Sequence, residues 1–246
     1  ISSFEHHCIL ETSESIEKSG LSDVTYIKPK RDGIIDAKYI EQALRPNTIL
    51  VSIMYVNNEI GTVQPIKEIG FLLKKYNSSP RKKTCPVLFH TDATQAVNYF
   101  NCNVDKINVD LLSVSAHKIS GPKGVGALYV RKGIPINRIM DGGSQENNRR
   151  AGTHNVTGIV GLGKAIELIK DHGAKQSRQI KILRDRLIEG ILRSIPSAKL
   201  NGSRVKRSPN NANFSFDNIE GESLVLALDA EGIACSTGSA CSSGSL

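Results

Sequence analysis

A lysine directly follows a buried-looking apolar run near the middle of the chain. Residues 111–116 are apolar or small, and His117, Lys118 and a glycine–proline turn come next. A strand that ends in this way delivers an amine to the carboxyl end of a sheet, where open α/β sheets bind their ligands. A lysine in a partly desolvated place loses proton affinity and can attack a carbonyl. A single lysine after a strand is nevertheless more often a solvated surface residue.

Two further apolar runs also end in polar side chains. Residues 48–56 lead to Asn58, and residues 86–89 lead to Asp92 and Gln95. Each run is followed by a segment that can be helical, so βα units repeat. Parallel strands place their carboxyl ends along one edge, so we expect six side chains to converge there: Asn58, Asp92, Gln95, Ser115, His117 and Lys118.

This combination of side chains suits pyridoxal phosphate. A lysine can bind the cofactor's aldehyde, a carboxylate can keep its pyridine nitrogen protonated, and polar donors can hold its phosphate and ring oxygen. Asp92 alone could instead be the N-cap of a helix beginning near Ala93. Because Lys118 lies 26 residues further on, which is enough for a strand, a crossover helix and a parallel strand, we favour the cofactor role.

Five short motifs follow one another along the chain. They are NNEIGT at 57–62, HTDATQ at 90–95, SAHKISGPKG at 115–124, GGSQE at 142–146 with RAGT at 150–153, and GSAC at 238–241. In type and order these motifs resemble those of cysteine desulfurases, the NifS/IscS group of aminotransferase class V. The resemblance covers essentially all 246 residues.

The resemblance implies a role for most of the matching residues. Lys118 then binds pyridoxal phosphate covalently and moves protons, Asp92 pairs with the pyridine nitrogen, and Gln95 reaches the ring hydroxyl. His6, in the Glu-His pair near the start of the chain, stacks on the ring. Cys241 becomes the catalytic thiol, and the small residues around it predict a mobile loop that keeps it out of the core.

Four further residues match cofactor contacts of the resembled family. Asn58, Ser115 and His117 lie at the cofactor, and Thr153 reaches the phosphate in the other subunit, which implies a homodimer. The glycine-containing loop before Thr153 departs from the family pattern at three positions, where Gly, Arg and Gly are usual: Ser144, Asn147 and Asn148.

The implied reaction converts L-cysteine to L-alanine and leaves a persulfide on Cys241. The sulfur then passes to an acceptor, such as a scaffold protein for iron–sulfur cluster assembly, or to thio-cofactor assembly. Two alternatives stay open: a selenocysteine lyase or another enzyme of the class V aminotransferase fold, and an inactive or purely binding fragment. We expect a fragment that lacks both termini, because the chain begins at Ile1 and stops at Leu246, just past the GSAC motif.

The fold expected from the resemblance is α/β, the fold type I of pyridoxal-phosphate-dependent transferases, with a mostly parallel sheet flanked by helices. We predict a large cofactor-binding domain over 1–172 and a smaller α/β domain over 173–246. Apolar periodicity predicts helices over 36–44, 65–76, 156–172, 178–195 and 222–230, and strands over 24–27, 126–131 and 213–216.

Composition narrows the functional class. Hydrophobic content of 39% and charged content of 23% are typical of soluble globular proteins, and no apolar run approaches the roughly 18 residues of a membrane span. The net charge of +8 is spread along the chain with no tryptophan among few aromatics, which argues against nucleic-acid binding. Five cysteines without a paired framework favour the reducing cytoplasm. The adjacent His6, His7 and Cys8 rarely face one point, so we predict no metal site.

Overall fold

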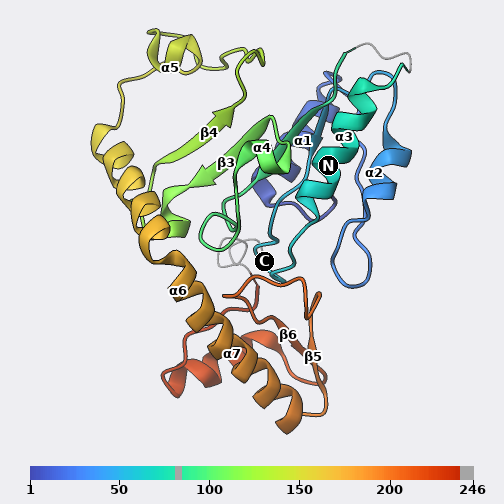
Figure 1. The fold of residues 1–246 in the computed structure, drawn as a ribbon. Coiled ribbons are helices and arrows are strands. Elements are labelled where there is room, and N and C mark those ends of the chain that lie inside the picture. Colours follow the sequence, from blue (N-terminus) through green and yellow to red (C-terminus); the bar gives the residue numbers. More distant parts are fainter. Residues whose placement is uncertain (81–84, 239–246) are drawn as a thin grey trace.

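A computed structural model describes residues 1–80 and 85–238 of the chain (Figure 1). Its helices and strands follow one another in this order: α1 (His7–Lys18), α2 (Ala37–Ala43), β1 (Leu50–Ser52), α3 (Ile66–Ser78), β2 (Leu88–Asp92), α4 (Val104–Ile107), β3 (Leu111–Ser115), the 3-10 helix η1 (Ala116–Ile119), β4 (Gly126–Val130), α5 (Gln145–Asn148), α6 (Val156–Ser194), β5 (Ala198–Leu200), β6 (Phe214–Phe216) and α7 (Gly221–Ala230).

The centre of the fold is a four-stranded sheet in the order β1-β2-β3-β4. β1 pairs in parallel with β2, and β2 in parallel with β3, whereas β4 runs antiparallel to β3. α3 connects the first parallel pair and α4 the second, so the predicted mostly parallel sheet flanked by helices is confirmed. In this topology the three parallel strands end on one edge.

Apolar side chains from the strands and from α3 form the main core. Ile66, Ile69 and Leu73 recur along one face of α3 at helical spacing and are buried. They belong to the same cluster as Phe89 of β2 and Ile53, which follows β1. Burial of such a face contributes most of the stability of a helix of this length, so the sheet and α3 form one rigid support.

A long helix leads from this sheet to a second, smaller region (Figure 1). α6 runs without interruption for 39 residues, and beyond it lie the antiparallel pair β5–β6 and α7. The prediction of two helices separated near Gly173 was therefore wrong. Gly173 is buried in the helix, where an added Cβ would lie 3.2 Å from Cγ2 of Ile169, one turn earlier. Close packing at this point accounts for a glycine in a continuous helix, and the predicted boundary between 172 and 173 falls inside α6.

Two other expected elements are replaced by irregular structure. The helix predicted to start near Ala93 is a series of turns, in which the amides of Ala96 and Val97 both donate to the Ala93 carbonyl. The strand predicted over 24–27 is reduced to one bridge between Ser2 and Ile27. Both segments hydrogen-bond locally or at a single register position, which is too little for a helix or a ladder.

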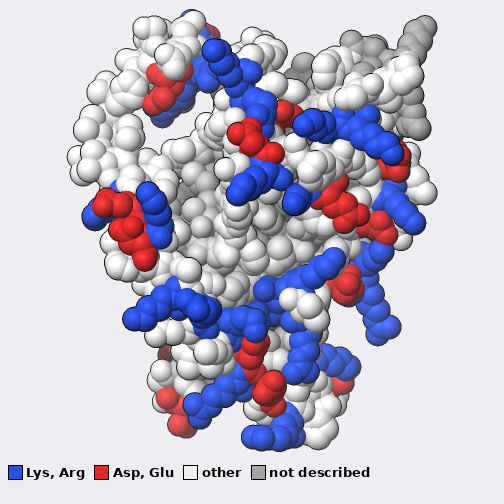
Figure 2. Space-filling model, in the orientation of Figure 1, with Lys and Arg blue, Asp and Glu red and all other residues white. Residues whose placement is uncertain are grey.

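Charge on the face shown in Figure 2 is not gathered into a single basic patch. Basic and acidic side chains are interspersed on that face (Figure 2). Within residues 1–80 and 85–238, no helix is both long and apolar enough to cross a membrane. The same residues hold no group of three or more His, Cys, Asp or Glu side chains that could bind a metal ion.

Candidate active site

The predicted acid and amine lie at the ends of neighbouring parallel strands. Asp92 is the last residue of β2, and Lys118 lies in η1, directly after β3. In the β2–β3 ladder Asp92 is the register partner of Ser113. Because β2 and β3 are parallel and adjacent, Asp92 and Lys118 lie at the same edge of the sheet.

The Asp92 carboxylate uses one of its oxygens in a local turn. Its Oδ1 accepts a hydrogen bond of 2.9 Å from the amide of Thr94, and its backbone carbonyl accepts one of 2.8 Å from the amide of Tyr55. In the described part of the chain, no hydrogen bond reaches Oδ2. The side chain is half-buried. Asp92 therefore stabilises a turn with one carboxylate oxygen, and its other oxygen can accept a hydrogen bond from a ligand.

The segment that carries Lys118 is fixed by its neighbours. The Lys118 carbonyl accepts a hydrogen bond of 3.0 Å from the Asn98 side chain, and the Ser115 hydroxyl lies 2.7 Å from Nδ1 of His117. Ser120 has a left-handed backbone with φ of 61°, which turns the chain sharply after η1. Lys118 is half-buried and His117 is exposed, so the amine sits at the boundary between sheet and solvent.

His6 caps the first helix. Its Nδ1 accepts a hydrogen bond of 3.2 Å from the amide of Cys8 and lies 3.1 Å from the Cys8 sulfur. A cap of this kind needs a lone pair on Nδ1, so a neutral His6 carries its proton on Nε2. The imidazole is half-buried and its orientation is set by the start of α1.

Glu5 is a buried carboxyl beside this site, for which the sequence suggested no role. Only 5% of the residue is exposed, and its Oε1 accepts hydrogen bonds from the Ser2 hydroxyl and, at 3.0 Å, from the Met54 amide. Burial raises the pKa of Glu5 to about 7, and the charge of Asp92 adds to this effect. The carboxyl ties the segment before His6 to the end of β1. The position of Glu5 directly before His6 is the sequence feature that could have indicated its role.

The Asp92 charge also acts on two other side chains that sequence reasoning missed. Burial raises the pKa of the Cys8 thiol, and Asp92 raises it further. Burial lowers the pKa of His90, and Asp92 opposes this effect. His90 lies between the hydroxyls of Ser52 and Ser113, at 2.7 and 2.9 Å, and so links β1, β2 and β3. The sequence shows only a histidine inside an apolar strand, which does not predict that it bonds to serines of both neighbouring strands.

Asn58 and Gln95 are half-buried near the ends of β1 and β2. The neighbour Asn57 is buried and makes the loop's own bonds, donating to the Phe4 carbonyl at 2.9 Å and accepting from the amides of Glu59 and Ile60. Among the described residues neither the Asn58 nor the Gln95 side chain forms a hydrogen bond, which leaves both amides able to bind a ligand.

One predicted site residue is not brought to this edge, and another cannot be placed because it lies outside the described residues. Thr153 is exposed in the loop before α6 and has no hydrogen bond within the residues described. Its loop is held by contacts within residues 138–154: a bond of 3.2 Å from the Gly152 amide to Gln145, an ion pair of 3.3 Å between His154 and Glu146, and a bond of 2.7 Å from Arg138 to the Asn148 side chain. Cys241 lies outside the described residues.

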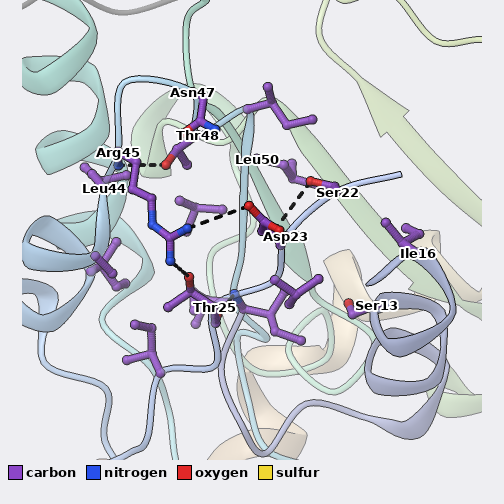
Figure 3. A pocket seen from close by; sticks show the side chains of 18 residues that line it. Ser13, Ile16, Ser22, Asp23, Thr25, Leu44, Arg45, Asn47, Thr48 and Leu50 are labelled. Atoms are coloured by element: carbon purple, nitrogen blue, oxygen red, sulfur yellow. Dashed lines mark hydrogen bonds and ion pairs between the residues drawn. The ribbon is translucent and has the colours of Figure 1, made fainter. Parts of the chain in front are cut away.

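A cavity of about 240 Å³ lies elsewhere, beside β1 (Figure 3). Its lining residues all fall between residues 1 and 53 and include neither Asp92 nor Lys118. The polar side is formed by Arg45, which donates to the Thr25 hydroxyl at 3.0 Å and lies 4.0 Å from Asp23 (Figure 3). The cavity holds no acid–amine pair of the kind found at the sheet edge and is a separate feature.

The residues at the sheet edge fit pyridoxal phosphate by their chemistry. Asp92 offers a carboxylate oxygen without a hydrogen bond from the described residues, and Lys118 offers an amine on the adjacent strand. His6 presents an imidazole held in one orientation at the start of α1. Such a carboxylate, amine and aromatic ring are the groups that bind this cofactor's nitrogen, aldehyde and ring face.

The chain is similar in sequence to several curated cysteine desulfurases. It is 51% identical over 245 residues to cysteine desulfurase IscS of Dictyoglomus turgidum, covering 100% of this chain and 60% of the relative. It is also 51% identical over 245 residues to IscS of Methanosarcina thermophila, covering 100% of this chain and 58% of the relative. It is 45% identical over 242 residues to a cysteine desulfurase of Nostoc sp., covering 98% and 58%. The chain thus spans about 60% of the length of the curated relatives it matches.

Solved structures agree with these sequence matches. A NifS-like protein superimposes with a TM-score of 0.86 at 35% identity, over 95% of this chain and 61% of that one. SspA in complex with cysteine superimposes with a TM-score of 0.77 at 38% identity, over 99% and 65%. The predicted fold type is therefore confirmed. The profile of the aminotransferase class-V family matches residues 1–246, and the chain belongs to that family.

Proposed function

We propose that the protein is a pyridoxal-phosphate-dependent cysteine desulfurase, which converts L-cysteine to L-alanine and passes the sulfur to an acceptor. The observation that carries the proposal is the placement of Asp92 and Lys118 at the ends of the adjacent parallel strands β2 and β3. The names of the relatives support the choice of reaction, since proteins about 50% identical to this chain are cysteine desulfurases.

The cofactor, when bound, supplies an electron-accepting ring that weakens bonds at the substrate's α and β carbons. Asp92 would keep the cofactor's ring nitrogen protonated, with Oδ2 available for this contact because Oδ1 accepts the Thr94 amide bond. Lys118 takes a proton from the substrate's Cα and later returns one, as general base and acid. His6 would hold one face of the cofactor's ring and keep water from it, with its imidazole oriented by the Cys8 amide.

The sulfur step needs no external oxidant or reductant. The Cys241 thiolate attacks the substrate sulfur, a sulfur–sulfur bond forms, and the bond between that sulfur and the substrate's β carbon breaks. The β carbon gains a proton and becomes the methyl group of alanine, and Cys241 becomes a persulfide. Its terminal sulfur then passes to an acceptor thiol, for iron–sulfur cluster or thio-cofactor assembly. The small residues flanking Cys241 suit a loop that visits both the site and an external partner.

The active protein in this proposal is a cytoplasmic homodimer. Thr153 lies exposed in the loop before α6 and, by the family resemblance, contacts the phosphate bound in the other subunit. A solved relative, SspA, is described in complex with cysteine, which supports cysteine as the substrate class. Asn58, Gln95, Ser115 and His117 complete the cofactor contacts that we propose at the sheet edge.

Titration of the full-length protein with pyridoxal phosphate tests the cofactor. We expect the visible absorbance band of lysine-bound cofactor in the wild type and in Lys123→Ala, because Lys123 is exposed in the same loop. Lys118→Ala should lose the band. A band that persists in Lys118→Ala would refute the assignment of the amine.

Mass spectrometry after addition of L-cysteine tests the reaction. We expect alanine to form and Cys241 to gain 1 sulfur atom per site, a mass shift of about 32 Da, as the balanced step requires. Cys241→Ser should block the transfer, whereas Cys235→Ser should retain it, since Cys235 is an exposed cysteine outside the motif. Turnover of selenocysteine without a persulfide from cysteine would identify a selenocysteine lyase. Amino-group transfer without sulfur release would identify another class V enzyme.

A further inference from the structure

A buried arginine connects the smaller region of the protein to the loop that carries Asn58. Arg207 lies between β5 and β6 in the sequence and is only 5% exposed. Its backbone forms an antiparallel bridge with Thr62, at the end of the 57–62 loop. The two segments are almost 150 residues apart in the sequence, with Arg207 bonding to Ile60 across a separation of 147 residues.

The guanidinium of Arg207 bonds to uncharged oxygens on both sides of this contact. It donates to the Ile60 carbonyl at 2.9 Å and to the Asn211 side chain at 2.7 Å. It also donates to the carbonyls of Ser203, at 3.1 Å, and Asn201. Three donor nitrogens of one planar group thus hold the 57–62 loop against residues 201–211, a geometry that lysine cannot reproduce.

This charge is buried without an anionic partner. Within residues 1–80 and 85–238, no carboxylate lies within ion-pair distance of Arg207, and Arg184 packs nearby with bonds to the carbonyls of Arg207 and Ser208. Burial, together with the Arg184 charge, lowers the pKa of Arg207 to about 10, so it remains charged at neutral pH. A buried charge is costly, and the acceptors that compensate it in the described part of the chain are carbonyl and side-chain amide oxygens.

Backbone and amide bonds extend the same contact along the loop. The Ser208 amide donates to the Gly61 carbonyl at 2.8 Å, and the Asn211 side chain donates to the Glu59 carbonyl at 2.7 Å. Asn57, on the other side of Asn58, is held by its bond to the Phe4 carbonyl. Asn58 therefore sits between two residues that are fixed, one by the main sheet region and one by the Arg207 segment.

We propose that Arg207 is a positioning residue, which fixes the 57–62 loop and thereby places Asn58 at the carboxyl edge of the sheet. Its effect on cofactor binding rests on the proposed function, because Asn58 is a cofactor contact there. Through Arg207 the smaller region helps to shape a site built on the larger one.

Hydrogen exchange and cofactor affinity, measured on the full-length protein, test this role. We expect Arg207→Met to speed exchange of the amides at 59–62 in the cofactor-free protein and to weaken pyridoxal phosphate binding about tenfold, the effect of losing one charged hydrogen bond. Arg204→Met is the matched control, because Arg204 is exposed and only 3.6 Å from Glu189 in a surface ion pair. It should change neither measurement by more than about twofold.

Two further variants separate positioning from general loss of stability. Asn211→Ala removes the bond to the Glu59 carbonyl and one acceptor of Arg207, and should loosen the loop even if Arg207→Met does not fold. Ile188→Ala, at a buried position of α6, should lower the free energy of unfolding without a selective increase in amide exchange at 59–62. Unchanged exchange at 59–62 in Arg207→Met and Asn211→Ala would overturn the inference. Faster exchange with unchanged cofactor affinity would overturn the positioning of Asn58. A wild type that binds no cofactor would overturn the proposed function instead, since exchange is measured without cofactor.

Discussion

Two loops carry predicted cofactor contacts, and the structure holds them very differently. The 57–62 loop, with Asn58, is bonded to Phe4 on one side and to Arg207 on the other. The 141–153 loop, with Thr153, is exposed, and Glu146 and Asn147 within its short helix have positive φ values of 51° and 56°. The first loop is bonded to segments far away in the sequence, whereas the bonds and ion pairs of the second come from residues 138–154, close to the loop itself.

The difference distinguishes cofactor-binding residues that their own chain holds in place from one that needs contacts with a second subunit. Asp92, Lys118 and Asn58 are placed by strand order and by buried hydrogen bonds, so a single chain suffices to preorganise them. Within residues 1–80 and 85–238, no comparable bond holds Thr153. This contrast fits a loop that completes the site of another subunit, as the proposed homodimer requires.

Asp92→Asn should have the largest effect on the ordered half of the site. Asparagine still accepts the Thr94 amide bond, so the turn survives, but it cannot stabilise a positive charge at the ring nitrogen. We expect kcat/KM for cysteine desulfuration to fall about 10²- to 10³-fold, as for loss of one preorganised electrostatic contact. Asp105→Asn, at an exposed carboxylate paired with Arg131, should stay near wild type. Equal losses in both variants would contradict the assignment.

Glu5→Gln should change how stability depends on pH. The pKa of Glu5 rises from its ordinary value of 4.5 to about 7 in the folded protein, so folding favours its protonated form. Its contribution is complete below pH 4.5 and is lost as the pH rises through about 7, amounting to about 3 kcal/mol of unfolding free energy at most. Denaturant unfolding at several pH values should show this decline in wild type and a flatter profile in Glu5→Gln. Glu41→Gln, at an exposed position of α2 with no ion pair among the described residues, should keep the wild-type profile.

Gly61→Ala and Gly152→Ala compare the two loops by one substitution. Both glycines have positive φ, 69° and 110°, so alanine strains either backbone. A Cβ at Gly61 would lie 2.4 Å from Cγ of the anchored Asn211, whereas one at Gly152 would meet the end of the Arg150 side chain at 2.8 Å. We expect Gly61→Ala to cost about 2 to 3 kcal/mol of unfolding free energy and Gly152→Ala about 1 kcal/mol. A larger loss of unfolding free energy in Gly152→Ala than in Gly61→Ala, measured by thermal or urea unfolding, would contradict the difference between the two loops.

Thr153→Ala should have the smallest effect on stability. Its exposed side chain makes no hydrogen bond in the part of the chain described, so unfolding free energy should change by less than about 0.5 kcal/mol. The affinity of the full-length protein for pyridoxal phosphate should nevertheless fall several-fold. Unchanged affinity, measured by fluorescence titration, would remove Thr153 from the site.

The sequence was sufficient to predict strands whose ends carry chemistry. Apolar runs closed by polar residues predicted β2 and β3 and, through their parallel pairing, the common edge of Asp92 and Lys118. The local turn at Asp92 was also predictable as a capping interaction, although the helix expected after it is a series of turns. Patterns of this kind report local preferences that the tertiary structure retains here.

Long-range contacts were beyond the reach of the pattern. The pattern predicts that a helix ends before Gly173, but the residue is buried within the continuous helix α6, at a glycine cost of about 1 kcal/mol. In the sequence Arg207 is one basic residue among many. Its burial depends on backbone carbonyls, such as that of Ile60, that only the folded chain brings close to it. Glu5 likewise acquires its raised pKa from burial and, to a smaller extent, from the charge of Asp92, which lies far along the chain.

Borohydride reduction of the cofactor-loaded protein, followed by peptide mass spectrometry, tests the central claim most directly. The reduction fixes the cofactor to whichever amine holds it. We predict a pyridoxyl group on Lys118 alone in the wild type, and a reduced yield at the same residue in Asp92→Asn. A label on Lys123 or another lysine, or a yield unaffected by Asp92→Asn, would contradict the account that these two strand ends form one site.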